Sequence, residues 1–253
     1  FLEFVNITNC NNLLTITIEN CASLKGLNIP SNVQTIIIKN CGELSTLDIP
    51  YSSNNNSISP LLNVIIDNCP GLKNLNLSGQ NNPNLKIELV GAWNLESLNL
   101  NAVATTDILL PSLYVNGQAN FKSLKSLNIS YTNIKSLNYN DVSYDYLELS
   151  AFPDLDFLYA SGCKELEKVV CVNNIDNPID LPSMAFFECA NLKTLYGNFN
   201  ITGSNVFYNC TSFKLNEPSV YATQGFDTFL EGENVCNLSF SSSSVLNLFS
   251  NTI

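Results

Sequence analysis

Two pairs of aspartates are the local acidic pairs whose spacing suggests acid–base chemistry. Asp154 precedes Asp156 by two residues, and Asp176 precedes Asp180 by four. Paired carboxylates can donate and accept protons or bind calcium, as in carbohydrate-active enzymes built on a parallel β-helix. The chain has no His and no Arg, so the usual proton shuttles and oxyanion clamps are missing. We therefore predict that the protein is not an enzyme, with a parallel β-helix-like carbohydrate-active enzyme as the alternative.

The nine cysteines are the other chemically reactive set, and their spacing indicates packing. Five of them follow an apolar-x-apolar triplet by three residues: Cys10, Cys21, Cys41, Cys69 and Cys163. Ala92 takes the same place after another triplet, and a position that accepts Cys or Ala is small and apolar. The pattern predicts buried free thiols. No Cys-x-x-Cys pair is present for zinc, so we expect no metal and no cofactor.

An asparagine stands directly before several cysteines, at Asn9, Asn20, Asn40, Asn68 and Asn209. Asparagine tolerates left-handed backbone, and its side chain bonds neighbouring peptide groups. These residues are therefore expected at a corner that is repeated along the chain.

A repeat of the form Leu-x-x-Leu-x-Ile must position these residues, and it recurs about every ten or eleven residues. Its apolar-x-apolar triplet has the period of two typical of a short strand. Sorted alternately, the triplets form two ladders. The first ladder contains Val5–Ile7, Leu27–Ile29, Leu47–Ile49, Leu75–Leu77, Leu98–Leu100, Leu127–Ile129 and Leu147–Leu149. The second contains Ile16–Ile18, Ile36–Ile38, Val64–Ile66, Ile87–Leu89, Leu113–Val115, Leu137–Tyr139 and Leu158–Ala160.

The ladders predict a β-rich leucine-rich-repeat solenoid. It is a right-handed parallel β coil with two short strands per turn of about 20–23 residues and little helix. An amphipathic helix is disfavoured because Pro30, Pro50 and Pro83 interrupt the pattern. We assign residues 1–215 to the solenoid, and residues 216–253 to irregular terminal repeats or a C-terminal cap of the same domain.

The charge balance limits the partners. The formal net charge of -11 comes from 22 acidic residues against 11 basic residues, all lysine, so a nucleic acid is a poor partner. No apolar run is long enough to span a bilayer, and we expect no membrane insertion by this segment. Neither a basic leader nor a C-terminal anchor signal is visible, so we expect that a targeting segment either lies outside this sequence or does not exist. A monomer is expected.

Two segments carry a family resemblance. The text from Cys21 to Ile36 resembles the BspA-like subclass (type 5) of leucine-rich repeats. The segment Ala185–Leu192 is similar to its Ala-Phe-x-x-Cys-x-x-Leu signature, and Val206–Phe213 repeats it 21 residues later. The resemblance implies a surface or secreted protein, mostly bacterial, that adheres to host proteins or neighbouring cells. The subclass shares no catalytic residues, so no active site is implied.

The middle residues of the triplets should face solvent as two stripes. On the first ladder they are Asn6, Asn28, Asp48, Asn76, Asn99, Asn128 and Glu148, which suggests a solvated polar stripe. On the second they are Thr17, Ile37, Ile65, Glu88, Tyr114, Asn138 and Tyr159. Exposed Ile and Tyr on a sheet suggest a contact surface, unless a loop or another domain covers them.

Insertions interrupt the period at residues 51–61, 101–112, 139–146 and 171–183. The third carries Tyr139, Tyr144 and Tyr146 with two aspartates, and either meets a sugar or peptide or forms an ordinary packed loop. Taken together, the sequence predicts an adhesin-like, non-catalytic extracellular or cell-surface scaffold. Its expected partners are host or neighbouring-cell proteins, or else glycans. A purely structural surface spacer is the other alternative.

Overall fold

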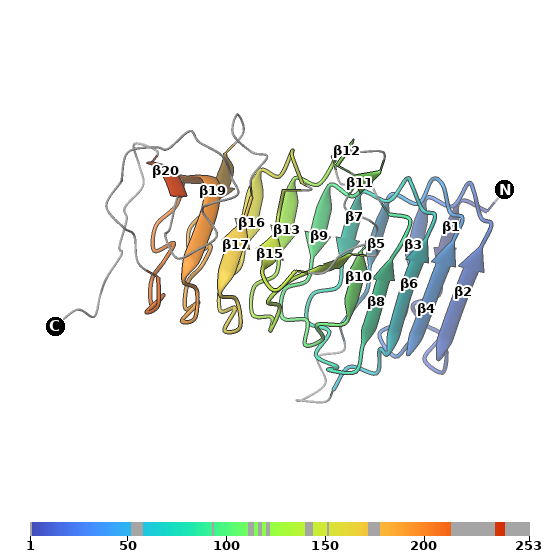
Figure 1. Ribbon diagram of the computed structural model, residues 1–253. Helices are drawn as coiled ribbons and strands as arrows, with labels where there is room; N and C mark the ends of the chain where they lie inside the picture. The colour runs from blue at the N-terminus through green and yellow to red at the C-terminus, as the bar shows by residue number, and fades with distance from the viewer. Residues whose placement is uncertain are drawn as a thin grey trace.

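The computed structural model describes residues 2–51, 58–92, 94–110, 114–115, 118–119, 122–139, 144–150, 152–171, 178–213 and 236–240. These residues form strands joined by turns, without a helix. Nearly all strands pair in parallel and lie side by side along the molecule (Figure 1). The prediction of a β-rich fold made of parallel strands is confirmed for the described residues.

One sheet has six strands, because the triplets of the second ladder alternate apolar and polar residues. Ile16, Ile36, Val64 and Ile87 lie in register on its buried face. Its strands, in spatial order, are β2 (Thr15–Glu19), β4 (Thr35–Lys39), β6 (Asn63–Asp67), β8 (Lys86–Leu89), β10 (Ile108–Leu110) and β14 (Asn138–Tyr139).

The other strands form a pair, β1 (Phe4–Asn6) with β3 (Gly26–Asn28), and a ten-stranded sheet. The ten-stranded sheet contains β5 (Thr46–Asp48), β7 (Asn74–Asn76), β9 (Ser97–Asn99), β13 (Ser126–Asn128), β15 (Leu147–Glu148), β16 (Phe157–Tyr159), β17 (Lys168–Val170), β18 (Ile179–Leu181), β19 (Thr194–Ile201) and β20 (Cys236–Phe240). The first half of β19 pairs with β17, and its second half pairs with β18 and β20. Of the predicted terminal segment 216–253, only β20 lies among the described residues.

The ladder assignment is wrong at three triplets. Ile108–Leu110 takes the place predicted for Leu113–Val115. Tyr114–Val115 (β11) instead pairs antiparallel with Gln118–Ala119 (β12), the next described strand along the chain. From β14 onward the alternation shifts, because the chain supplies both β14 and β15 between β13 and β16. Leu158 therefore pairs with Leu127 of the first ladder, and Leu147 pairs with Val169.

A single hydrophobic core joins the sheets. Leu47, Leu75, Leu98, Leu127 and Leu158 are consecutive register partners and are all buried. The same cluster includes Leu27 of β3 and the inward residues of the six-stranded sheet. Described strands approach only the strands beside them in a sheet or at a sheet junction. Stability therefore comes from local interfaces repeated along the molecule.

Corners hold left-handed residues in columns. Asn20, Asn40 and Asn68 have φ of 59°, 55° and 50°, as predicted for asparagines before cysteines. The Asn68 amide donates to Asn40 Oδ1 at 2.7 Å, and the Asn40 amide donates to Asn20 Oδ1 at 3.0 Å. Asn209 is also left-handed, with φ of 58°, whereas Asn9 is not among the left-handed residues. The amide ladder satisfies side-chain polar groups while the corner is repeated.

Glu188 has left-handed backbone, although its side chain does not favour that conformation as the short amide of asparagine does. Its φ is 60°, and its side chain is exposed. Replacing Glu188 with Asn is expected to raise stability by about 1 kcal/mol, because the left-handed region disfavours other L-residues. Thermal unfolding should show this as a rise of about 2–4 °C in melting temperature. Glu43→Asn is the control, because Glu43 is exposed but not left-handed. Equal effects of both changes would contradict the strain at Glu188.

The β1–β2 end of the core is open within the described part of the chain. Leu2, Phe4 and Leu14 are 54%, 68% and 52% exposed. Beside them lies a hollow of about 430 Å³ lined largely by apolar side chains, including Val5 and Ile16. The next inward residues, such as Leu24 and Ile36, are completely buried, so this end presents the same apolar interior uncovered.

Candidate binding surfaces

The outward face of the six-stranded sheet carries a central row of side chains, here named the isoleucine row. Strand register places its members side by side: Thr17, Ile37, Ile65, Glu88, Leu109 and Asn138. Ile37 and Ile65 are part-buried by their neighbours, whereas Ile36 and Ile38 on either side of Ile37 point inward and are fully buried. Two adjacent β-branched apolar side chains thus face outward.

Polar residues border the isoleucine row on both sides. Thr35 and Asn63 lie on one side, and the Asn63 amide donates to Thr35 Oγ1 at 3.4 Å. Glu19, Lys39 and Asp67 lie in register on the other, with charges of alternating sign. An apolar centre with a polar rim is the usual composition of a protein interface.

Four predicted contact residues, Ile37, Ile65, Glu88 and Asn138, lie in this row, but two others do not. Leu109 takes the place predicted for Tyr114, whose backbone lies in the β11–β12 hairpin and whose side chain is outside the described residues. Tyr159 lies in the ten-stranded sheet beside Asn128, because of the shift in alternation after β14. The binding role of this row stays a prediction.

The predicted asparagine stripe has a structural role at strand ends. Oδ1 of Asn76, Asn99 and Asn128 each accepts the backbone N–H two residues later, at 3.1, 3.1 and 3.0 Å. Glu148 was predicted to face solvent in this stripe but is buried in β15. Its Oε1 accepts the Ser150 N–H at 2.6 Å, which is the same local bond with a longer side chain.

An aromatic pair lies on the outward face of β16 in the ten-stranded sheet. Phe157 is 39% exposed, and Tyr159, two residues later on the same face, is part-buried. Asp180 of β18 is the register partner of Phe157 and accepts the Asn200 amide through Oδ1 at 2.7 Å. The sequence reasoning missed Phe157, because it considered only the middle residue of each triplet as outward.

The three tyrosines of the predicted loop 139–146 pack against one another, whereas residues 140–143 lie outside the described residues. Tyr144 lies 6.5 Å edge-on from the buried Tyr139 and 5.1 Å from Tyr146, between ring centroids. The Lys168 ammonium lies 4.5 Å from the centre of the Tyr146 ring, so this chain's own cation occupies that face. Burial, followed by the nearby Glu148 carboxylate, raises the pKa of Tyr146 to about 12. This cluster joins β14 to β15 and offers little free aromatic surface.

Five of the described cysteines form two buried columns of free thiols. Cys41 and Cys69 occupy one, and Cys163, Cys189 and Cys210 occupy the other. Cys189 and Cys210 donate to the Ala160 and Phe186 carbonyls at 2.8 Å, so the thiols also satisfy buried acceptors. Burial raises the pKa of Cys69 to about 11, which keeps that thiol neutral.

Not every position predicted to hold a small buried side chain is buried. Ala92 is completely buried, as its place in the pattern predicts. Cys10 is exposed and Cys21 is only part-buried, so the prediction of burial is wrong for Cys10 and only partly met by Cys21. Both follow β1 or β2 at the open end of the core, where no further described strand covers them.

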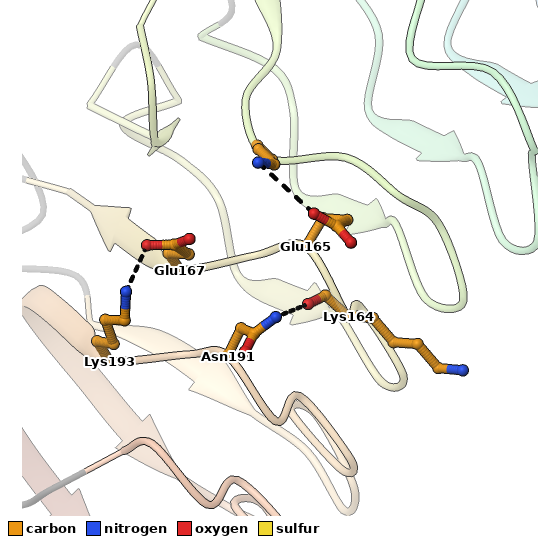
Figure 2. A network of polar contacts seen from close by, with 6 residues as sticks. Lys164, Glu165, Glu167, Asn191 and Lys193 are labelled. Carbon is orange, nitrogen blue, oxygen red and sulfur yellow. Dashed lines mark hydrogen bonds and ion pairs between the residues drawn. The ribbon is translucent and has the colours of Figure 1, made fainter.

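Exposed ion pairs link successive repeats near the C-terminal half. The Lys193 ammonium lies 2.7 Å from Glu167 Oε2, and the Asn191 amide donates to the Lys164 carbonyl at 2.7 Å (Figure 2). The hydrogen bond from Lys193 lowers the pKa of Glu167. These pairs are solvent-exposed, so they contribute little stability.

Three of the four aspartates in the predicted acidic pairs lie among the described residues. Asp154 and Asp156 are both exposed, while Asp176 lies outside the described residues. Among the residues that are described, no group of three or more His, Cys, Asp or Glu could hold a metal ion. No described helix is long and apolar enough to cross a membrane.

Comparison with known proteins adds no assignment. No protein-family model, curated protein or solved structure matches the chain.

Proposed function

We propose that the chain is a non-catalytic leucine-rich-repeat scaffold of a secreted or surface-displayed protein, and that it binds partner proteins of a host or neighbouring cell. The repeat spacing supports the fold. Ile16, Ile36, Val64 and Ile87 are register partners separated by 20, 28 and 23 residues. The chain moves alternately between the six-stranded sheet and the strands opposite as far as β14. This pattern fits a parallel β coil with two strands per turn.

The resemblance to BspA-like repeats has support from the signature residues. Phe186 and Phe207 hold equivalent places in its two copies, and their rings stack at 5.7 Å with an interplanar angle of 5°. Cys189 and Cys210 are both buried and donate to carbonyls of the preceding repeat. Residues at equivalent positions of the two copies therefore have equivalent environments, as expected of a structural repeat.

The side-by-side placement of Ile37 and Ile65 on an outward sheet face carries the binding proposal. Each exposes part of an apolar side chain, and the row Glu19, Lys39 and Asp67 supplies charges of both signs next to them. Partner binding would bury the two isoleucines and select orientation through the charges.

The test uses the full chain immobilised against a panel of purified extracellular-matrix and cell-surface proteins. The double variant Ile37→Ser, Ile65→Ser is expected to weaken binding of the captured protein by about ten-fold or more, because two central apolar contacts are lost. The variant Ile58→Ser, Leu62→Ser is the control. Ile58 and Leu62 are 64% and 38% exposed but lie outside the isoleucine row.

Two results would contradict this proposal. Equal binding by the double variant and the unmodified chain would remove the isoleucine row as the contact surface. Failure of the chain to bind any protein in the panel, while a longer parent protein binds one, would favour the alternative of a structural spacer.

A further inference from the structure

We propose that the outward face of β16 and β18 binds an arginine side chain of a partner segment. The site, here named the aromatic–acidic patch, consists of Phe157, Tyr159 and Asp180. It lies on the ten-stranded sheet, separate from the isoleucine row, and does not depend on the function proposed above.

The geometry brings an aromatic ring and a carboxylate together. Phe157 and Asp180 are register partners on neighbouring parallel strands, and parallel strands lie about 4.8 Å apart. Phe157 is 39% exposed, which is unusual for a phenylalanine on a sheet with polar neighbours such as Ser126. Asp180 accepts one bond from Asn200, and a carboxylate can accept several more.

This combination is complementary to a guanidinium group. A planar guanidinium stacks on an aromatic face and, at the same time, donates in parallel to a carboxylate. An ammonium makes only a point contact, so we expect arginine to bind more tightly than lysine. Tyr159 extends the apolar surface along the same strand, where it would contact the arginine stem.

Charge around the patch points to the same partner. Exposed Asp154 and Asp156 stand shortly before Phe157 in the sequence, and the exposed Lys125 accepts the Asp156 N–H through its backbone carbonyl. The whole chain carries a net charge of -11 and contains no arginine of its own. A cationic segment is therefore attracted to this face, whereas an anionic one is repelled.

The test measures fluorescence anisotropy of the full chain with a labelled Gly-Arg-Gly-Arg-Gly-Arg peptide. Matched peptides carry lysine or the neutral arginine analogue citrulline. We expect the arginine peptide to bind most tightly and the citrulline peptide at least ten-fold more weakly. Phe157→Ser and Asp180→Asn should each lower affinity for the arginine peptide about five-fold, which is the range of one cation–π or charge-assisted contact.

Asp48→Asn is the matched control, because Asp48 of β5 also accepts an asparagine amide, from Asn76, but its register partner is not aromatic. It should change affinity less than two-fold. Equal losses for Asp48→Asn and Asp180→Asn would overturn the proposal and assign binding to overall charge. Equal binding of the citrulline and arginine peptides would also overturn the proposal. Displacement of the arginine peptide by a neutral cello-oligosaccharide would overturn it in favour of a glycan-binding site. Thermal unfolding of each variant confirms that the fold is intact.

Discussion

Replacing Gly91 with alanine is expected to destabilise the protein by about 3 kcal/mol or more, since the new methyl group has no room. A Cβ at Gly91 would lie 1.9 Å from the Asn68 nitrogen and 2.4 Å from its Cα. These are backbone atoms of the adjacent repeat, and the Gly91 carbonyl also accepts the Cys69 N–H at 3.0 Å. Relieving the contact must therefore separate two repeats. Circular dichroism should show a fall of about 6–12 °C in melting temperature.

Gly42→Ala is the matched control for this change. Gly42 lies at a corner of the same sheet, but an added Cβ would meet nothing closer than the Ala22 carbonyl oxygen at 3.9 Å. Alanine also restricts the unfolded chain, so stability should stay unchanged or rise by about 0.4–1 kcal/mol. A melting temperature for Gly91→Ala equal to that of the control would show that the repeats separate without cost.

Truncating Phe207 to alanine is expected to cost about 3–5 kcal/mol, as for other buried aromatic side chains. Phe207 is only 1% exposed, and its ring stacks on Phe186 at 5.7 Å and on Phe213 at 4.5 Å. The change leaves a cavity and removes both ring contacts. Phe207→Leu keeps most of the volume and should lose less than half as much.

Hydrogen exchange distinguishes where the Phe207→Ala loss occurs. The backbones of described strands approach closely only those of adjacent strands, so protection should fall in β18 and β19 while β2, β4 and β6 keep their native protection. A uniform loss across both ends would show that the protein unfolds as one cooperative unit. Such a result would argue against the nearest-neighbour description of its stability.

The strand positions could be predicted from the sequence wherever successive triplets alternate between the two sheets. The Leu47, Leu75 and Leu98 column and the Ile36, Val64 and Ile87 column were predicted because alternating apolar residues fix which face is buried. Sorting by alternation failed where β14 and β15 follow each other before the chain returns at β16. The residues of a triplet do not indicate which sheet its strand joins, because this depends on the path of the chain between triplets.

The candidate surfaces could be predicted where the alternation of side chains along a strand alone decides which residues face outward. Ile37 and Ile65 are the middle residues of apolar triplets, and they face outward as that alternation requires. Phe157 could have been found from the residue before each triplet, since Ser97, Ser126 and Phe157 share an outward row. The packing of Tyr146 involves Lys168 of β17, and no local sequence pattern contains that information.

Because the backbone of each described strand approaches closely only adjacent strands, such a chain can change in length by whole units. Deleting or duplicating one whole unit, for example the stretch from β6 to the residue before β8, joins two surfaces that already have the same register and the same apolar interior. Tandem duplication in the coding DNA can thus lengthen the protein without a redesigned fold. The length of the molecule can then vary, while the units that are kept retain their local structure.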